Sequence, residues 1–449
     1  MKRLIANMMP LALCGALALL SAPADAAADK GTQVPLGVCR YDYLVYRPEQ
    51  PFDSRQYGDP SKIGDKYNDH FHVLWDEKRR LYYAFWTQAS WEGASDMHVC
   101  FSKSSDKGVT WTKPTVISGS ETRKRPRLKA YYQQPMISKS GRLYCLWMEQ
   151  YVGWGYMGSY SDDAGESWSP PQITAIRRMD QDPTDYRRAA NWINWQRPLR
   201  LGRDGRFFVG CSRHGKAPYD EMECTKVEFW EFLNIDDDPE VAGIRMDYFA
   251  ANRQALDVGK MATKDYFRPT GKYASGSPEG PAIEEASVVK LPDGRLFALM
   301  RSSVGHPVWS VSKDDGRSWS ALKPLLDHDG GKAFKHPRAP CPIYDRHGDD
   351  AASGDYFTFV QNEFDFTADT AARQPRRQLY IVAGRFTPGA EQPISFSTPK
   401  LFSPRHYANS MYSSYTVADG QGVLWFPDMK YYLLGRRITD ELFADLPAR

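Results

Sequence analysis

Polar and titratable side chains recur at one place in the repeating pattern of this chain, several residues before each of six predicted hairpin turns. These residues are His70 and His72, Gln133 and Gln134, Gln196 and Arg197, Glu284 and Glu285, His336 and Arg338, and Tyr412. Carboxylates and imidazoles transfer protons, guanidinium groups bind anions, and a phenol becomes a nucleophile when a base removes its proton. Because each group has the same place in its own unit, we expect them to converge on one site. For any single residue the alternative is a buried polar group that satisfies only local hydrogen bonds.

Each of these groups leads into an apolar strand, a turn and a second apolar strand. The clearest examples read "MISKSGRLYCLW", "LRLGRDGRFFVG", "SVVKLPDGRLFALM" and "YTVADGQGVLWF", with Ser-Gly or Asp-Gly pairs that are typical of hairpin turns. The six turns are expected near Lys78, Gly141, Gly205, Gly294, Gly348 and Gly420. Units of this size predict an all-β fold, a six-bladed β-propeller over residues 27–449. The segment before residue 70 supplies either a strand that closes the ring or a seventh blade.

A second pattern, S-x-D-x-G-x-x-W, occurs three times. The copies are "SSDKGVTW", "SDDAGESW" and "SKDDGRSW", which begin at Ser104, Ser161 and Ser312. The Gly permits a tight turn, the Asp accepts backbone N–H bonds inside it, and the Trp covers the base of the hairpin. A residue repeated in several units seldom has a unique chemical task, so we interpret Asp106, Asp163 and Asp314 as scaffold.

This box resembles the Asp-box of sialidases and related BNR-repeat proteins, and the resemblance covers most of the chain after residue 26. The segment "EASVVKLPDGRLFALMR" is similar to the sialidase strand pair that carries a catalytic Glu and then a substrate-binding Arg, here Glu285 and Arg301. The segment "MYSSYTVADGQGVLWF" is similar to the one that holds the nucleophilic Tyr, here Tyr412. The resemblance implies a sialidase-like glycoside hydrolase that releases a terminal sialic acid or a related acidic sugar from a glycan.

Each implied role has a physical reason. A phenol with a pKa near 10 needs a base to act as a nucleophile at neutral pH, and Glu285 would take the proton of Tyr412. A neutral phenol also avoids placing a carboxylate nucleophile against an anionic sugar. The family uses three Arg residues to bind the substrate carboxylate by bidentate pairing. Arg301 matches by motif, whereas Arg338 and Arg197 match only by their place in the units.

Two positions depart from the family pattern. Sialidases usually begin the first blade with a Phe/Tyr-Arg-Ile-Pro motif, but this chain reads "NDHFHVLW", which puts His70 or His72 in place of an Arg. Alternation places both histidines on one face of a strand, and we expect them to bind substrate together with Gln134 of the next unit. The acid/base Asp of the family corresponds loosely to Asp96, with Glu92 as the second choice.

Two other functions remain open. A polysaccharide lyase acting on uronate-containing glycans needs a His or Tyr base at the sugar C5, an Arg that neutralises the carboxylate, and an acid for the leaving oxygen. His70, His72, Tyr412 and Arg197 would supply these groups. A propeller that binds glycans without cleaving them is the third possibility.

The N-terminus and the composition restrict location and partners. Lys2 and Arg3 precede an apolar run that ends in Ala24-Asp25-Ala26, which predicts a signal peptide over residues 1–26 and a secreted or periplasmic protein. No later segment is apolar enough to span a membrane. A net charge of +3 with scattered Lys and Arg gives no reason to expect nucleic acid, and 13% aromatic residues suit both strands and sugar-binding surfaces.

No metal and no cofactor are expected. The sequence has no CxxC pair and no Cys/His cluster with zinc spacing, and His70 with His72 lacks a spaced third ligand. The six cysteines after residue 26 form disulfides or remain buried thiols.

Overall fold

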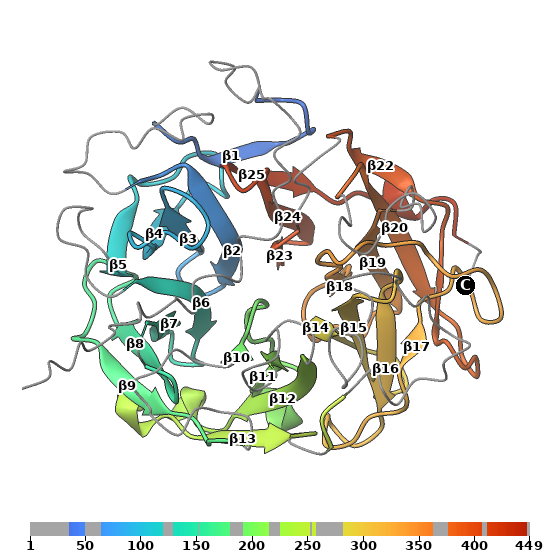
Figure 1. The fold of residues 1–449 in the computed structure, drawn as a ribbon. Coiled ribbons are helices and arrows are strands. Elements are labelled where there is room, and N and C mark those ends of the chain that lie inside the picture. The colour runs from blue at the N-terminus through green and yellow to red at the C-terminus, as the bar shows by residue number, and fades with distance from the viewer. Residues whose placement is uncertain are drawn as a thin grey trace, which may run out of the picture.

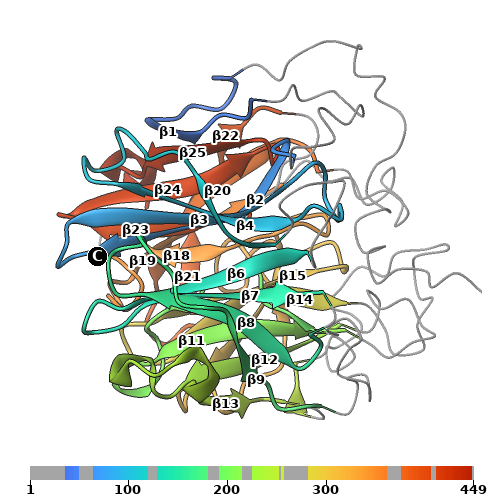
Figure 2. The same cartoon turned by 90° about the vertical axis from the view of Figure 1, so that its left-hand side faces the viewer.

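Six β-sheets surround a common axis in the computed structural model (Figure 1). The structure describes residues 36–49, 64–119, 129–150, 152–179, 192–214, 225–251, 254–256, 282–361, 376–405 and 411–446. The side view in Figure 2 shows the strands running broadly along this axis. The fold is therefore the predicted six-bladed β-propeller, and each sheet is one blade.

The blades share one antiparallel order, from the axis outward. The strands nearest the axis are β2 (Tyr67–Asp76), β6 (Ala130–Ile137), β10 (Trp192–Ile193), β14 (Ile283–Lys290), β18 (Ile343–Asp345) and β23 (Ser414–Ala418). The second strands are β3 (Leu81–Ala89), β7 (Leu143–Glu149), β11 (Phe207–Arg213), β15 (Leu296–Ser302), β19 (Asp355–Val360) and β24 (Gln421–Asp428).

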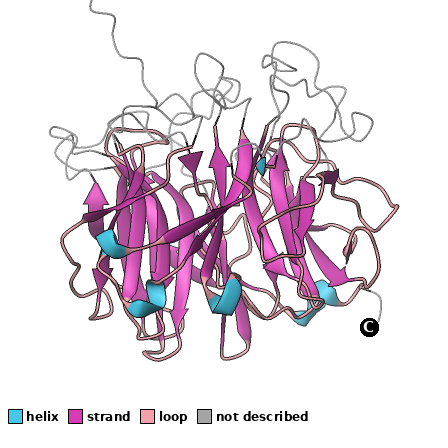
Figure 3. Ribbon diagram, turned by 90° about the horizontal axis from the view of Figure 1, so that it is seen from below, coloured by secondary structure: helices cyan, strands magenta, loops and turns pink. Residues whose placement is uncertain are grey.

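The outer half of each blade is less uniform. The third strands are β4 (His98–Ser104), β8 (Gly155–Ser161), β12 (Lys226–Phe232), β16 (Val308–Ser312), β20 (Leu379–Phe386) and β25 (Tyr432–Arg437). The outermost strands are β5 (Thr115–Gly119), β9 (Gln172–Ala175), β13 (Met246–Phe249), β17 (Lys323–Pro324), β21 (Ile394–Phe396) and β1 (Tyr43–Tyr46), and β22 (Lys400–Ser403) also pairs with β20. In the described part the helices are short 3₁₀ turns (Figure 3): Arg203–Gly205, Ile235–Asp237, Val241–Gly243 and Asp440–Phe443.

The ring is closed by its N-terminal strand. β1 pairs antiparallel with β25, so a segment from the start of the described chain completes the blade made by its end. This pairing decides between the two roles expected for the segment before residue 70: it closes the ring and does not begin a seventh blade. Closure of the ring protects the sheet edges. The aromatic core continues between the first and the last blade, where the ring centroids of Tyr82 and Trp425 lie 5.3 Å apart.

The predicted hairpins are confirmed at all six places, because each expected turn lies between the first and second strand of a blade. The three Asp-boxes lie after β4, β8 and β16, between the third and fourth strands. Antiparallel order puts both kinds of turn at one end of the ring, and it puts the beginnings of the first strands at the other end. The polar residues that precede the hairpin turns in the sequence therefore lie toward the end of the ring opposite the Asp-boxes.

Three of the innermost strands, β2, β6 and β14, bulge near their beginnings. Each bulge holds a non-glycine residue with left-handed backbone: His70 (φ 53°), Tyr132 (φ 55°) and Glu285 (φ 57°). Such a backbone is costly for residues other than Gly, and bulges re-aim side chains next to functional sites. In two cases a hydroxyl of the preceding blade accepts the bulged N–H: Thr87 Oγ1 from Tyr132 at 3.0 Å, and Ser212 Oγ from Glu285 at 2.8 Å.

Two further expectations concern the chain as a whole. The five cysteines that the structure describes (Cys39, Cys100, Cys145, Cys211 and Cys341) are buried thiols without disulfides, and Cys224 lies outside the described residues, as does the predicted signal peptide. In the part of the chain that is described, no helix has the length and apolar character needed to cross a membrane.

Candidate active site

Tyr412, Glu285 and Arg301 meet near the axis of the ring. Tyr412 lies just before β23, Glu285 in the bulge of β14, and Arg301 on β15. The Tyr412 hydroxyl donates a hydrogen bond of 2.6 Å to Glu285 Oε1, and Arg301 Nη1 donates one of 3.0 Å to Tyr412 Oη. Arg301 Nη1 also contacts Glu285 Oε1. All three are buried, and the phenol oxygen lies between a carboxylate and a guanidinium.

The environment sets the protonation of this group. Burial raises the pKa of the Glu285 carboxyl above its ordinary value, opposed by Arg301 and reinforced by the charge of Glu284. Burial and Glu285 raise the pKa of Tyr412, while Arg301 lowers it. The phenol is therefore neutral at rest and hydrogen-bonded to a carboxylate with strengthened basicity, as base-activated attack requires.

Glu284 holds a second guanidinium beside the first. Its Oε1 lies 2.7 Å from Arg338 Nε and 3.1 Å from Arg301 Nε. Burial by itself raises the pKa of Glu284, but Arg301 and Arg338 outweigh it and bring it down to about 2. The ionised carboxylate of Glu284 thus links Arg338 to Arg301.

The ring of Tyr412 is enclosed by three other side chains. His70 stacks on it with ring centroids 4.5 Å apart, and Trp195 lies parallel at 6.4 Å. Lys430 Nζ lies 5.2 Å from its centroid. Burial, and then the charge of Lys430, lower the pKa of His70 well below its ordinary value, so this imidazole is neutral. Neither ring nitrogen of His70 has a hydrogen-bond partner among the described residues.

Lys430 joins the site to two carboxylates. Its ammonium lies 3.0 Å from Asp69 Oδ2 and 2.9 Å from each carboxylate oxygen of Glu92. Sequence analysis missed Lys430 and Asp69. Lys430 lies in the turn between β24 and β25, for which no motif was considered, and Asp69 directly precedes His70, one of the two histidines expected in place of the family Arg. Glu92, the second choice for the acid, is the member of its loop that reaches this cluster.

The other sequence candidates from the first two blades lie deeper in the ring. His72 is fully buried, and burial and the charge of Arg197 lower its pKa, so it too is neutral. Gln134 is buried and donates to the Asn194 carbonyl of the next blade at 3.0 Å. His336, from the fifth unit, has both ring nitrogens engaged by backbone groups, of Ala339 and Gln361, which matches the structural alternative.

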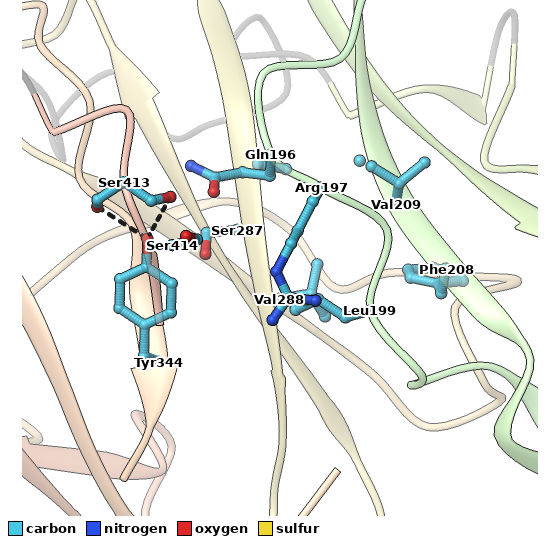
Figure 4. Close-up of a pocket in the computed structure, with 12 residues that line it drawn as sticks. Gln196, Arg197, Leu199, Phe208, Val209, Ser287, Val288, Tyr344, Ser413 and Ser414 are labelled. Atoms are coloured by element: carbon cyan, nitrogen blue, oxygen red, sulfur yellow. Dashed lines mark hydrogen bonds between the residues drawn. The ribbon is translucent and has the colours of Figure 1, made fainter. Parts of the chain in front are cut away.

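Arg197 lies apart from the cluster around Tyr412. It lines a small axial pocket together with the side chains labelled in Figure 4, among them Gln196, Tyr344 and Ser414. Its Nη2 lies 3.0 Å from Asp349 Oδ1, in the turn between β18 and β19, and 3.2 Å from the Tyr415 carbonyl. No described contact links Arg197 with Arg301 or Arg338, so its expected role in binding substrate stays a prediction.

Asp96 organises a loop. Its carboxylate accepts hydrogen bonds from the Gly64 N–H at 2.9 Å, the Ser90 N–H at 3.2 Å and the Ser90 hydroxyl at 2.5 Å. Burial opposes these donors, which nevertheless lower its pKa. Its expected role as the acid also stays a prediction.

Arg376 is a further residue that sequence analysis missed. It lies shortly before β20, and its charge lowers the pKa values of both Glu285 and Tyr412. The sequence offered only a basic run, "RQPRRQ", as a signal. Among the described residues there is no group of three His, Cys, Asp or Glu side chains able to hold a metal ion.

Comparison with known proteins agrees with this architecture. Residues 80–420 match the model of the BNR repeat-like domain, and the chain belongs to this family. No curated protein matches the sequence. Among solved structures the chain is similar to the NanB sialidase from Streptococcus pneumoniae, with TM-score 0.57, 10% identity, and 91% of this chain and 72% of that chain covered.

Three other solved structures share this fold. The Trypanosoma rangeli sialidase in complex with sialic acid aligns with TM-score 0.54 and 12% identity over 92% of this chain and 60% of that one. A protein of unknown function from Dyadobacter fermentans aligns with TM-score 0.54 and 14% identity over 88% and 97%. The chain also spans 66% of the Hadza microbial sialidase Hz136. At these identities the likeness establishes the fold.

Proposed function

We propose that the protein is a retaining exo-glycosidase that removes a terminal sialic acid or a related acidic sugar from glycans. The observation that carries the proposal is the phenol of Tyr412, hydrogen-bonded to Glu285 at 2.6 Å and to Arg301 at 3.0 Å. A phenol that shares its proton with a carboxylate and faces a fixed cation is arranged for nucleophilic attack.

In this reaction Glu285 takes the proton of Tyr412 while the phenol oxygen attacks the anomeric carbon. The bond to the leaving oxygen breaks, and an acid of the protein protonates that oxygen. Water then gives a proton to that acid, now ionised, as its oxygen attacks the anomeric carbon; the bond to Tyr412 breaks, and Tyr412 regains its proton from Glu285. Because two displacements occur at one carbon, the released sugar keeps its anomeric configuration.

The guanidinium groups of Arg301 and Arg338 lie on the Glu285 side of Tyr412 and are the proposed partners of the sugar carboxylate. Arg376 adds positive charge to the same region. His70, one of the two histidines expected in place of the family Arg, contributes a neutral imidazole. The positive charge of Arg301 and Arg338 is therefore smaller than that of two unpaired arginines, because the carboxylate of Glu284 contacts both.

The test is hydrolysis of an aryl sialoside by wild type and by Tyr412→Phe, which removes only the attacking oxygen. Turnover should be lost in Tyr412→Phe with the fold retained. Tyr160→Phe is the matched control, since the Tyr160 hydroxyl donates to Glu240 on the outer part of a blade. Near wild-type turnover by Tyr412→Phe would reject the proposal.

A polysaccharide lyase is the second candidate, and the neutral imidazole of His70 beside Tyr412 favours it. Together the two groups resemble the His/Tyr pair that removes the C5 proton of a uronate. β-Elimination leaves an unsaturated uronate that absorbs ultraviolet light, whereas hydrolysis creates no double bond. Incubation with uronate-containing glycans while absorbance is recorded distinguishes the two functions.

A further inference from the structure

The proposed glycosidase needs an acid for the leaving oxygen, and this inference rests on that proposed function. The acid must hold a proton before the reaction and must lie close enough to the nucleophile to reach the leaving oxygen of the same sugar. The described donors to Asp96 keep that carboxyl ionised. A different carboxyl, that of Asp69, shares two neighbours with Tyr412.

Asp69 and Tyr412 have two neighbours in common, His70 and Lys430. Asp69 directly precedes His70, whose imidazole stacks on the Tyr412 ring at 4.5 Å. It also shares Lys430 with Tyr412, because the ammonium lies 3.0 Å from Asp69 Oδ2 and 5.2 Å from the ring centroid. The carboxyl and the nucleophile thus flank the same imidazole and the same cation.

The two oxygens of Asp69 differ. Oδ2 accepts a hydrogen bond of 3.2 Å from the Tyr67 hydroxyl and faces Lys430. Oδ1 is buried and has no hydrogen-bond partner among the described residues. A protonated Oδ1 would be free to donate to an oxygen of a bound ligand, which is the contact that an acid needs.

The charges around Asp69 favour that proton. Asp69 and Glu92 share one ammonium, which can neutralise only one carboxylate. Glu92 binds Lys430 with both oxygens and is 35% exposed, whereas the Asp69 side chain is fully buried. The remaining neighbours, Tyr67 and His70, are neutral and do not stabilise a second negative charge. Burial raises the pKa of Asp69 against the opposing charge of Lys430.

We propose that Asp69, rather than Asp96, is the acid that protonates the leaving oxygen, with Lys430 and Glu92 as positioning residues. As Tyr412 attacks, the proton passes from Asp69 Oδ1 to the oxygen of the breaking glycosidic bond, and Lys430 compensates the new carboxylate. In the second half, Asp69 takes a proton from the attacking water, whose oxygen bonds to the anomeric carbon as the bond to Tyr412 breaks. The two steps together return the enzyme to its starting protonation state.

The experiment compares two substrates that share a sugar and differ in the leaving group: 4-nitrophenyl sialoside, whose phenol needs little protonation, and sialyllactose, whose alcohol needs it fully. Asp69→Asn should lose about 10²-fold or more of kcat on sialyllactose and much less on the aryl sialoside. Asp96→Asn should change the two substrates alike, and Asp314→Asn is the scaffold control. Equal losses on both substrates in Asp69→Asn, or a selective loss in Asp96→Asn, would overturn the assignment.

The wild-type pH profile tests the same idea without the Asp69 variant, which matters if Asp69→Asn fails to fold. An acid acts while protonated, so kcat/KM on sialyllactose should fall as pH rises through the Asp69 pKa, and the aryl sialoside should show a weaker fall. Lys430→Met should move that alkaline limb to higher pH, because losing the cation disfavours the carboxylate. An alkaline limb unmoved in Lys430→Met would contradict the proposal. If wild type cleaves neither substrate, the sialidase function itself fails, which is a different result from equal losses in Asp69→Asn.

Discussion

The carboxylates at the two ends of the ring differ in how their oxygens are hydrogen-bonded. In the Asp-box after β16, Asp314 accepts hydrogen bonds from the Ser312 hydroxyl at 2.8 Å, the Ser318 N–H at 2.8 Å and the Ser318 hydroxyl at 2.6 Å. Asp106 and Asp163 repeat these contacts in their own boxes. Each box supplies donors to both oxygens from within its own turn.

At the other end, Glu285 and Asp69 each keep one oxygen without a hydrogen-bond partner among the described residues. The difference appears in their acidity: hydrogen bonds lower the pKa values of Asp106, Asp163 and Asp314, whereas burial raises those of Glu285 and Asp69. A carboxylate satisfied by its own turn stays charged and inert. A buried carboxylate with a free oxygen can exchange protons with a ligand.

The largest expected effect on this comparison is the loss of the base. Glu285→Gln should reduce kcat on an aryl sialoside by about 10²–10⁴-fold, because Tyr412 would keep its proton, while ligand binding survives. Asp163→Asn, in a box, should leave kcat/KM close to wild type. Steady-state kinetics of both variants on the aryl sialoside measures these effects. Equal losses of kcat in Glu285→Gln and Asp163→Asn would contradict the distinction between the carboxylates at the two ends of the ring.

A pH profile gives an intermediate effect. A base acts when deprotonated, so kcat/KM should rise with pH through a Glu285 pKa that lies above the ordinary value of 4.5. The negative charge of Glu284 is one cause of the raised pKa of Glu285. Glu284→Gln should therefore move the acid limb of the profile to lower pH. Movement to higher pH would show that Glu284 acts on Glu285 in some other way.

The smallest effect is expected on stability, at the box end. The hydrogen bonds of the box lower the pKa of Asp163 to about 2, below the ordinary value of 3.8. A group with a depressed folded-state pKa stabilises the fold above its unfolded-state pKa and loses that contribution as pH falls through the folded-state value. Asp163→Asn should lower Tm slightly at neutral pH, and the gap to wild type should close between about pH 4 and pH 2. Thermal unfolding across this range measures it; a gap that does not depend on pH would rule out the carboxylate as its cause.

Local patterns in the sequence predicted the ring well. Hairpin pairs and boxes depend on residues close together in the chain, and all six turns and three boxes lie where these patterns placed them. The meeting of Glu285, Arg301 and Tyr412 was implied by the resemblance, which matched all three residues by motif.

The remaining features depend on contacts between distant blades. The bulges at His70, Tyr132 and Glu285 carry no Gly or other local signal, since hydroxyls of the preceding blade hold two of them. Lys430 reaches Asp69 across more than three hundred residues from a turn without a motif. The pairing of Arg197 with Asp349, which lies more than one hundred residues away in the chain, likewise has no signal in the sequence.

The central claim is that Tyr412 forms a covalent bond to the sugar, and trapping that bond tests it most directly. Incubation with 3-fluorosialyl fluoride should slow breakdown of the intermediate, because fluorine beside the anomeric carbon destabilises the oxocarbenium-like transition state. Mass spectrometry of the intact protein should show the addition of one fluorosialyl group, located in the peptide that contains Tyr412 and absent in Tyr412→Phe. An active enzyme that accumulates no adduct, or carries it on another residue, would contradict the account.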